Sequence, residues 1–172
     1  TGVFAYVVGE KGHVTTYEAR KELQNLAIKN VTRLDLADRV TFILRDIGDG
    51  FTTQGADALF LDLPNPFDYM HHVRTALKPG GFFGCILPTV NQVAKLLISL
   101  RENNFAFIDV CENLLRYYKP EHDRLRPVDR MVSHTGYLIF ARPVIPISLT
   151  SNSFDNDDID DDQAEPDDII DD

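Results

Sequence analysis

The stretch ADALFLDLPNPF, from Ala56 to Phe67, is the most informative part of the sequence for the fold. Its first eight residues include the apolar run Ala58–Leu61, which is typical of a strand in a sheet that is covered on both faces. The strand ends near a carboxylate, Asp62, and Pro64 and Pro66 stiffen the loop that follows. Because rigid loops at strand ends often carry the reactive groups of α/β proteins, Asp62 is a candidate functional residue.

Similar apolar runs lie on both sides of this stretch and recur at intervals of roughly 20 residues. We predict strands at His13–Glu18, Arg39–Asp46, Ala56–Leu63 and Gly81–Pro88. Segments with helical spacing of apolar residues lie between or after them, at Ala19–Leu34, Tyr69–Leu77 and Val90–Glu102. This alternation predicts an α/β fold with a mostly parallel sheet that is covered by helices on both faces.

The pattern changes after Glu102. Two longer apolar runs, Ala106–Tyr118 and Gly136–Arg142, are separated by a charged stretch from Lys119 to His134. We interpret the two runs as a closing antiparallel hairpin with a long connection. Residues 1–147 are therefore expected to form one domain, followed by an acidic disordered tail at residues 148–172 whose composition buries too little apolar surface to order itself.

The charge of the chain is unevenly distributed. The formal net charge is −10, but the segment from Ser151 to Asp172 contains 10 Asp, 1 Glu and no Lys or Arg. Subtracting −11 from −10 leaves about +1 for the rest, so the acidic pI does not argue against an RNA partner for the folded part.

The two cysteines, Cys85 and Cys111, are too few for a disulfide framework and fit a reducing compartment. No apolar run has transmembrane length, and the first residues do not resemble a signal peptide. We expect a cytoplasmic protein. His134 has no Cys or His partners at ligand spacing, so no metal is expected.

Acidic residues close three of the predicted strands. Glu18 could accept hydrogen bonds from the two hydroxyls of a ribose, or could instead favour the N-terminus of the following helix. Asp46 could accept a hydrogen bond from the amine of adenine, with the Ile47 amide facing a ring nitrogen, or could be a turn residue before Gly48. Asp62 could carry chemistry or cap a helix.

The segment RPVDRMVSHTGYLIF, from Arg126 to Phe140, combines charged and polar groups. Arg126 and Arg130 could contact phosphates, and His134 and Thr135 could bond a base edge or a backbone group. The alternative is a solvated loop that leads into a strand, which composition alone favours.

Four segments together resemble the tRNA (adenine-N1) methyltransferase family, whose usual target is adenine 58 of the T-loop. They are VGEKGHVTTYE, LDLPNPF, ILPTVNQV and RMVSHTGYLIFAR, and the last is the most specific. The similarity extends from Val8 to Pro143. It implies a Rossmann-like class I methyltransferase sheet with S-adenosylmethionine as cofactor and tRNA as substrate.

The resemblance also implies roles for individual residues. Glu18 would hold the cofactor ribose, Asp46 and Ile47 its adenine, and Asp62 would lie beside the methionine part and the target base. Arg130, His134 and Thr135 would line the RNA side. The family's usual assembly is a tetramer, so a homo-oligomer is expected.

The sequence departs from the family pattern in several places. Phe67 stands where the family has Trp, and Ser133 stands where it has Gly. The family's first strand and its glycine-rich loop are not found in this chain, so we expect a sheet without its central strand that folds poorly or binds cofactor weakly by itself.

Three rival functions remain open. A small-molecule methyltransferase would keep Glu18 and Asp46 but would not need the segment from Arg130 to Leu138. A non-catalytic tRNA-binding partner subunit would not need Asp62. A nicotinamide-dependent dehydrogenase could use Glu18 on a ribose, but Asp46 and the DLPNP loop would have no role in hydride transfer.

Overall fold

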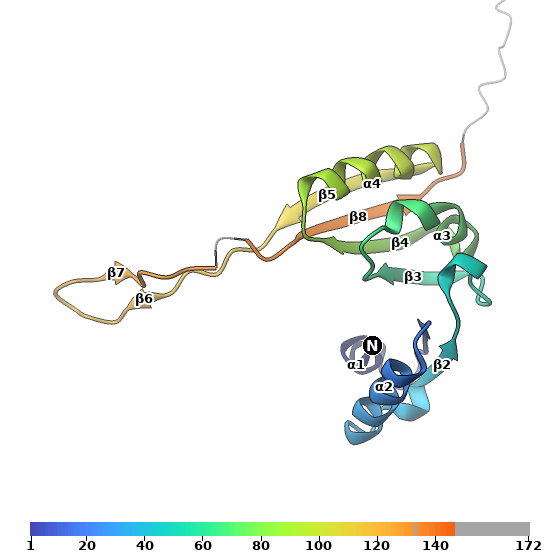
Figure 1. Cartoon of the computed structure of the whole chain (residues 1–172), viewed down its shortest axis with the longest axis horizontal. Helices are drawn as coiled ribbons and strands as arrows, with labels where there is room; N and C mark the ends of the chain where they lie inside the picture. The colour runs from blue at the N-terminus through green and yellow to red at the C-terminus, as the bar shows by residue number, and fades with distance from the viewer. Residues whose placement is uncertain (133, 147–172) are drawn as a thin grey trace, which may run out of the picture.

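The structure is a computed structural model that describes residues 1–132 and 134–146 (Figure 1). The acidic segment 148–172 and Ser133 lie outside the described residues. The helices are α1 (Gly2–Val7), α2 (Lys21–Arg33), α3 (Met70–Ala76) and α4 (Val90–Glu102), with short 3₁₀ turns η1 (Ala37–Arg39), η2 (Ile47–Asp49) and η3 (Pro66–Tyr69). The strands are β1 (Val14–Glu18), β2 (Val40–Leu44), β3 (Ala56–Leu61), β4 (Leu77–Leu87), β5 (Phe105–Glu112), β6 (Tyr118–Lys119), β7 (Arg126–Pro127) and β8 (Tyr137–Pro143).

The main strands form two separate sheets. β1 and β2 pair in parallel, and β3, β4, β8 and β5 form a four-stranded sheet in that order. β3 and β4 are parallel, whereas β8 runs antiparallel to both β4 and β5. The predicted α/β fold with a closing antiparallel hairpin is confirmed. Among the described residues no strand joins β1 to β3, as expected for a sheet without its first strand.

Strand β4 begins earlier than predicted. α3 ends at Ala76, and Leu77 already has extended backbone angles and pairs with Ala56 of β3. Pro79 explains this boundary, because its ring cannot continue a helix. Residues Leu77–Gly80 therefore form the start of β4, although the sequence predicted the end of a helix and a turn there.

The main core lies on one face of the four-stranded sheet, beneath α3 and α4 (Figure 1). Val93, Leu96 and Leu100 recur at helical spacing along α4 and are buried. Each fully buried side chain of this size contributes roughly 1.5–3 kcal/mol to folding. This helix and core hold the carboxyl ends of β3 and β4 in place.

The opposite face of this sheet is less covered than predicted. Phe60, Phe82 and Phe140 point to that side and are between 38% and 56% exposed. Among the described residues the aromatic contact on this face is between Phe60 and Phe4 of α1, with ring centroids 5.8 Å apart. In the described part of the chain α3 and α4 both pack on the other side of this sheet, and α1 contacts this face through Phe4.

A smaller core joins the N-terminal elements. Ala5, Val31, Leu36 and Val40 are buried together and hold α1 and α2 against β2. The tie between β1 and the segment leading to β3 is polar, because the Tyr17 hydroxyl contacts Thr52 Oγ1 at 2.9 Å and Thr53 Oγ1 at 3.0 Å. Burial raises the pKa of Tyr17, but these hydrogen bonds outweigh it and lower the pKa overall.

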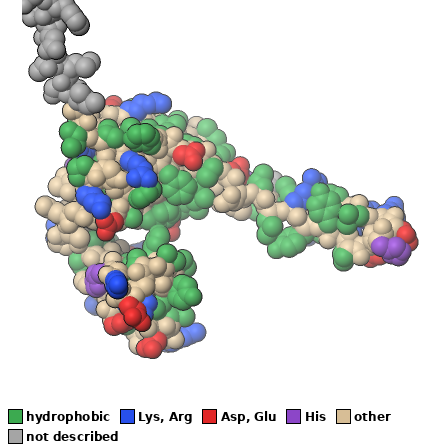
Figure 2. Space-filling view, turned by 180° about the vertical axis from the view of Figure 1, so that it is seen from behind, with side chains coloured by type: hydrophobic (Ala, Val, Ile, Leu, Met, Phe, Trp, Pro, Cys, Tyr) green, Lys and Arg blue, Asp and Glu red, His purple; other side chains and the backbone are tan. Residues whose placement is uncertain are grey.

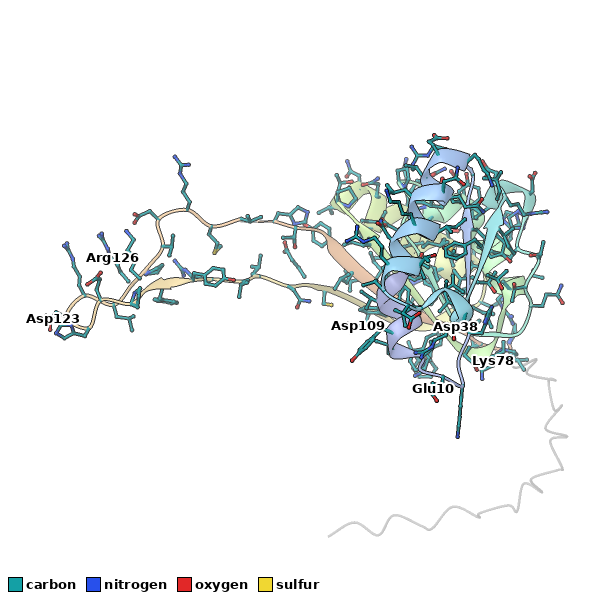
Figure 3. The ribbon with its side chains drawn as sticks, turned by 90° about the horizontal axis from the view of Figure 1, so that it is seen from below. Glu10, Asp38, Lys78, Asp109, Asp123 and Arg126 are labelled. Atoms are coloured by element: carbon teal, nitrogen blue, oxygen red, sulfur yellow. The ribbon has the colours of Figure 1, made fainter. Side chains whose placement is uncertain are left out.

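The predicted long connection is a projecting arm, which we define as residues 113–132 (Figures 1 and 2). β6 and β7 pair antiparallel within it, and Lys119 forms an ion pair with Asp129 at 2.6 Å. Asp123 and Arg126 lie at its far end, away from Asp38 and Lys78 of the body (Figure 3). β5 ends at Glu112 rather than at Tyr118, because the chain leaves the sheet there to form this arm.

Candidate active site

The candidate site lies at the carboxyl ends of β1, β2 and β3. Glu18 is the last residue of β1 and pairs with Leu44 of β2, and the Arg45 N–H donates to the Glu18 carbonyl at 3.0 Å. Asp46 therefore emerges on the same edge as Glu18, one strand away. In open α/β sheets this edge is where ligands bind.

The Glu18 carboxylate is held by its own turn. Its Oε1 accepts from the Arg20 N–H at 2.9 Å and from Arg20 Nε at 3.4 Å, and the side chain is 32% exposed. Among the described residues its Oε2 has no hydrogen-bond partner. One carboxylate oxygen is thus fixed in direction while the other remains available to a donor.

Asp46 caps the η2 turn. Its Oδ1 accepts from the Gly48 N–H at 2.8 Å, as the turn interpretation of the sequence expected, and Oδ2 has no partner in the described chain. Arg45 fastens the turn by donating to the Gly50 and Asp49 carbonyls at 2.8 and 2.5 Å. The Ile47 N–H has no backbone acceptor among the described residues, so a ligand acceptor can reach it.

The η2 turn also contacts the second sheet's helices. Ile47 packs against the main core, and His72 Nε2 of α3 lies 3.1 Å from the Gly48 carbonyl. α3 directly follows the loop that carries Asp62. These contacts bring the β2 end and the β3 end toward one another although the two strands belong to different sheets.

Asp62 differs from the other two carboxylates. It is exposed immediately after the buried Leu61, and within residues 1–132 and 134–146 neither of its oxygens forms a hydrogen bond or ion pair. Cys85 of β4 lies nearby, and burial together with the charge of Asp62 raises the pKa of its thiol to about 12. Both Asp62 oxygens are therefore free for a ligand, and the neighbouring thiol stays protonated.

Helix α4 holds the loop behind Asp62. Gln92 Nε2 donates to the Pro64 carbonyl at 2.8 Å, and Ser99 Oγ donates to the Phe67 carbonyl at 2.8 Å. The Phe67 ring packs against the main core, with Lys95 Nζ 5.3 Å from its centroid. The two prolines and these bonds make a stiff support for Asp62.

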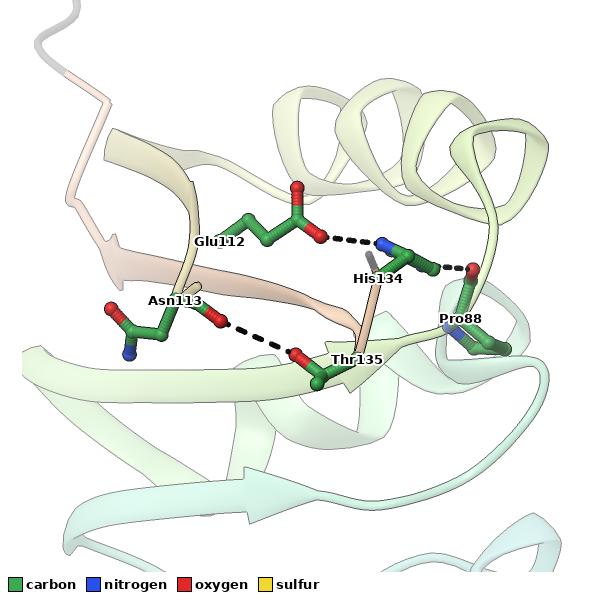
Figure 4. A network of polar contacts seen from close by, with 5 residues as sticks. All are labelled: Pro88, Glu112, Asn113, His134 and Thr135. Carbon is green, nitrogen blue, oxygen red and sulfur yellow. Dashed lines mark hydrogen bonds and ion pairs between the residues drawn. The ribbon is translucent and has the colours of Figure 1, made fainter. Parts of the chain in front are cut away.

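The three residues expected on the RNA side lie at or near the root of the arm. Arg130 is exposed and makes no ion pair in the described part of the chain. His134 contacts Glu112 at 2.6 Å and the Pro88 carbonyl at 2.7 Å, and Thr135 Oγ1 donates to the Asn113 carbonyl at 3.5 Å (Figure 4). Both ring nitrogens of His134 are thus occupied within the chain.

Two residues at this edge were not singled out from the sequence. Glu112 is the last residue of β5 and forms a hydrogen bond with His134. Gln92 of α4 donates a hydrogen bond to the Pro64 carbonyl in the loop after Asp62. Gln92 stands inside the ILPTVNQV segment, which marked the region but not the residue. Glu112 has only the weak signal of a carboxylate at the end of an apolar run.

In the described ranges no group of three or more His, Cys, Asp or Glu side chains is placed to hold a metal ion. None of the described helices is long and apolar enough to cross a membrane.

Solved structures with the same architecture define the class of protein. A crystal structure from Thermotoga maritima described as a SAM-dependent O-methyltransferase is 49% identical, with a TM-score of 0.80 over 84% of this chain and 54% of that one. The tRNA (m1A58) methyltransferase TrmI from Aquifex aeolicus is 39% identical, with a TM-score of 0.73 over 84% of this chain and 58% of that one. The fold is that of the class I methyltransferases, which use S-adenosylmethionine.

The family is narrower than the class. The chain belongs to the family described as the tRNA methyltransferase complex GCD14 subunit, whose model matches residues 2–129. The tRNA (adenine(58)-N(1))-methyltransferase TrmI of Thermus thermophilus is 31% identical over 139 residues, which is 80% of this chain and 54% of that protein. The chain spans about half the length of the curated relatives that it matches.

The side chains at the edge fit this cofactor. S-adenosylmethionine presents two ribose hydroxyls, an adenine amine and an ammonium group, all of which donate hydrogen bonds. Glu18 and Asp46 each keep one oxygen without a partner in the described chain, and Asp62 keeps two. The acceptors thus match the donors in chemical type, with Ile47 offering a backbone donor to a ring nitrogen.

Proposed function

We propose that the protein containing this chain transfers a methyl group from S-adenosylmethionine to N1 of an adenine in tRNA, at position 58. Membership of the tRNA methyltransferase family and the names of the relatives from Thermus thermophilus and Aquifex aeolicus support this activity. The structural observation that carries the proposal is Asp62, an exposed carboxylate with no partner among the described residues, at the same edge as Glu18 and Asp46.

In the proposed reaction the chain's residues bind and orient. Glu18 would accept hydrogen bonds from the ribose hydroxyls of the cofactor. Asp46 would accept one from the adenine amine, and the Ile47 N–H would donate one to a ring nitrogen. The bound cofactor supplies a methyl group on a positively charged sulfur. Adenine N1 has a free lone pair, so a new N–CH₃ bond forms as the S–CH₃ bond breaks, and no proton has to be removed first. Positioning is therefore the main requirement.

Asp62 has a separate role from the two cofactor-binding carboxylates. The methylated adenine ring becomes cationic as the new bond forms. Asp62 at the edge of the base can accept a hydrogen bond from the exocyclic amine, and its negative charge stabilises the positive charge that develops. The stiff loop keeps the carboxylate in place without reorganisation.

The RNA side is proposed to involve the arm. N1 lies on the pairing edge of the base, so the target adenine has to leave its stack to reach the site. Arg126 and Arg130 are exposed on the arm, where guanidinium groups can contact phosphates. Thr135 lies at the arm root, beside Asn113.

We also propose that the protein is a homo-oligomer, in the form of a tetramer, whose subunits meet through the arm. The arm exposes large apolar side chains far from the core, and these side chains cover much of its surface (Figure 2). They are Leu114, Leu115, Tyr117, Tyr118, Leu125, Val128, Met131 and Val132. An apolar surface of this kind is characteristic of an interaction site. A second copy of the same arm offers a complementary apolar surface.

O-methylation of a hydroxyl is the second candidate, because one similar structure is described as an O-methyltransferase. That reaction requires a general base to take the hydroxyl proton. The doubly protonated form of His134 that fits its two partners has no lone pair to accept a proton, which leaves Asp62 as the carboxylate at this edge that could do so. The N1 reaction needs no such base, and the family match supports tRNA adenine as the substrate.

The test is methyl transfer from labelled S-adenosylmethionine to unmodified tRNA by the full-length protein, with mapping of the modified nucleotide. We expect 1-methyladenine at position 58. Binding of tRNA without transfer would instead support a non-catalytic partner subunit. Transfer to small hydroxyl compounds but not to tRNA would support the O-methyltransferase.

A further inference from the structure

His134 lies at a junction of three segments at the root of the arm (Figure 4). It precedes β8, and its ring reaches Glu112 at the end of β5 and Pro88 just after β4. Tyr137 of β8 is the register partner of both Leu87 and Glu112, and its ring centroid is 4.7 Å from that of His134. The imidazole thus joins the two sides of the arm root to the loop after β4.

The two hydrogen bonds define the protonation state that fits this geometry. Nδ1 is 2.6 Å from a Glu112 carboxylate oxygen and Nε2 is 2.7 Å from the Pro88 carbonyl. Neither partner carries a hydrogen when Glu112 is ionised, and a neutral imidazole has only one N–H to donate. Only the imidazolium form donates both bonds, and its charge is balanced by Glu112.

The residue after Pro88 is connected by side-chain hydrogen bonds to the loop that carries Asp62. Pro88 precedes Thr89, the N-cap of α4, and Thr89 Oγ1 donates to Gln92 Oε1 at 2.5 Å. Gln92 Nε2 in turn donates to the Pro64 carbonyl at 2.8 Å, two residues after Asp62. The support of Asp62 and the root of the arm are therefore connected through one short polar path.

We propose that His134 is a positioning residue for methyl transfer, whose doubly donating imidazolium fastens the arm root to the loops of Pro88 and Asp62. This inference rests on the proposed function but concerns a residue whose two ring nitrogens face partners within the chain. The proposed role differs from the direct contact of His134 with RNA that the family resemblance implies. Loss of the proton removes one of the two bonds, which frees the Pro88 loop or the β5 end and loosens the Asp62 support.

The pH dependence follows from the partners of the ring. The hydrogen bond to Glu112, and after it the bond to Pro88, raises the pKa of His134 above its ordinary value. Glu112 and Tyr137 are the titratable groups in contact with the ring in the described part of the chain. A raised pKa means that the stabilisation is complete below the ordinary His pKa of about 6.5 and is lost as the pH rises through the folded-state pKa.

The experiment compares His134→Gln with His122→Gln in the full-length protein. His122 is also on the arm but lies near its tip with a side chain 91% exposed, so it controls for the loss of a histidine. The kcat for tRNA methylation is measured between pH 6 and 9, and cofactor affinity is measured by calorimetry. We expect kcat of wild type and His122→Gln to fall as the pH rises. His134→Gln should be about tenfold slower at low pH, without that fall and with unchanged cofactor affinity.

Glu112→Gln is the second variant, because it keeps the histidine and removes only the balancing charge. It should move the decline in kcat to lower pH. If His134→Gln retains the wild-type pH profile, or if Glu112→Gln leaves the decline where it was, the proposal is wrong. Equal loss of kcat and cofactor binding in His134→Gln would indicate general damage to the fold and would also overturn it.

Amide hydrogen exchange gives a readout that does not depend on activity. In His134→Gln the amides of residues 62–68 and 89–92 should exchange about tenfold faster than in His122→Gln, because their support is released. If exchange is faster in His134→Gln but the wild-type protein does not methylate tRNA, the structural support by His134 stands and the proposed function fails. If exchange in His134→Gln is unchanged although the wild-type protein methylates tRNA, the proposed function stands and the role of His134 fails.

Discussion

Three carboxylates share the candidate site, and they differ in how much of their hydrogen-bonding capacity the chain already uses. Glu18 and Asp46 each accept a backbone hydrogen bond from the following turn with one oxygen, whereas both oxygens of Asp62 have no partner among the described residues. Asp62 can therefore exchange water for ligand donors at both oxygens, whereas Glu18 and Asp46 can each do so at one. This difference distinguishes the two residues proposed to bind the cofactor from the residue proposed to act on the base.

Asp62→Asn should lower kcat for tRNA methylation by roughly 100-fold, because the amide cannot balance the charge that develops on adenine. Cofactor affinity should change much less, since Glu18 and Asp46 remain. Asp57→Asn is the matched control, because it removes the same charge from the opposite end of β3, where Asp57 pairs with Lys78. A similar loss of kcat in both variants would contradict a specific role for Asp62.

Glu18→Gln should weaken S-adenosylmethionine binding about tenfold, because an amide accepts hydroxyl hydrogen bonds less strongly than a carboxylate does. At saturating cofactor, kcat should change little. Calorimetry on the full-length protein measures the affinity, with Glu22→Gln in the first turn of α2 as control. Equal effects of the two substitutions would mean that Glu18 acts only through the field of the helix N-terminus.

At the scale of elements, the η2 turn connects β2 to the second sheet. Gly50 ends this turn with φ of 78°, and a Cβ at that position would lie 3.3 Å from His72 Nδ1. Gly55 has a similar φ of 70° but nothing within 4 Å of such a Cβ. Substituting each glycine by alanine therefore separates two contributions to the free energy of unfolding. Both substitutions strain the backbone, but only the one at Gly50 also displaces His72.

Gly55→Ala should destabilise the full-length protein by about 1 kcal/mol, the usual cost of a left-handed conformation for a residue with a side chain. Gly50→Ala should cost more than Gly55→Ala and should also weaken cofactor binding, because the turn carries Asp46. Denaturant unfolding gives the free energies. Equal losses at the two positions would show that the contact with His72 contributes nothing.

For the whole molecule, the arm is the feature that the single chain does not explain. Its apolar side chains are strongly exposed, with Leu115 at 68% and Leu125 at 71%, and within the described body such levels gather mainly on the short helix α1, at Val3, Tyr6 and Val7. Burial of such side chains between copies would stabilise the assembly through the hydrophobic effect.

Replacing Leu115 and Leu125 together by Ser should therefore lower the oligomeric mass of the full-length protein in sedimentation experiments. Ile98→Ser is the control, because Ile98 is 57% exposed on α4, outside the arm. An unchanged mass in the double variant would place the subunit contacts elsewhere. A lower mass in the control as well would point to a nonspecific effect of removing apolar surface.

Much of the fold was predictable because its signals are local. The strands, the amphipathic face of α4 and the closing hairpin follow from the periodicity of apolar residues, which depends on the geometry of neighbouring residues along the chain. The acidic residues at the strand ends followed from the same pattern. The arm and the early start of β4 did not, because pairing with distant partners such as Ala56 determines where a strand begins.

The sequence by itself determined the class of fold, the family resemblance and the positions of Glu18, Asp46 and Asp62. Only the tertiary structure decided which of these carboxylates is free, and that both nitrogens of His134 are occupied by partners 22 and 46 residues away in the chain. The physical reason is that hydrogen-bond partners are chosen by proximity in space. That proximity arises when β4, β5 and β8 come together in one sheet, so the spacing of residues along the chain does not contain it.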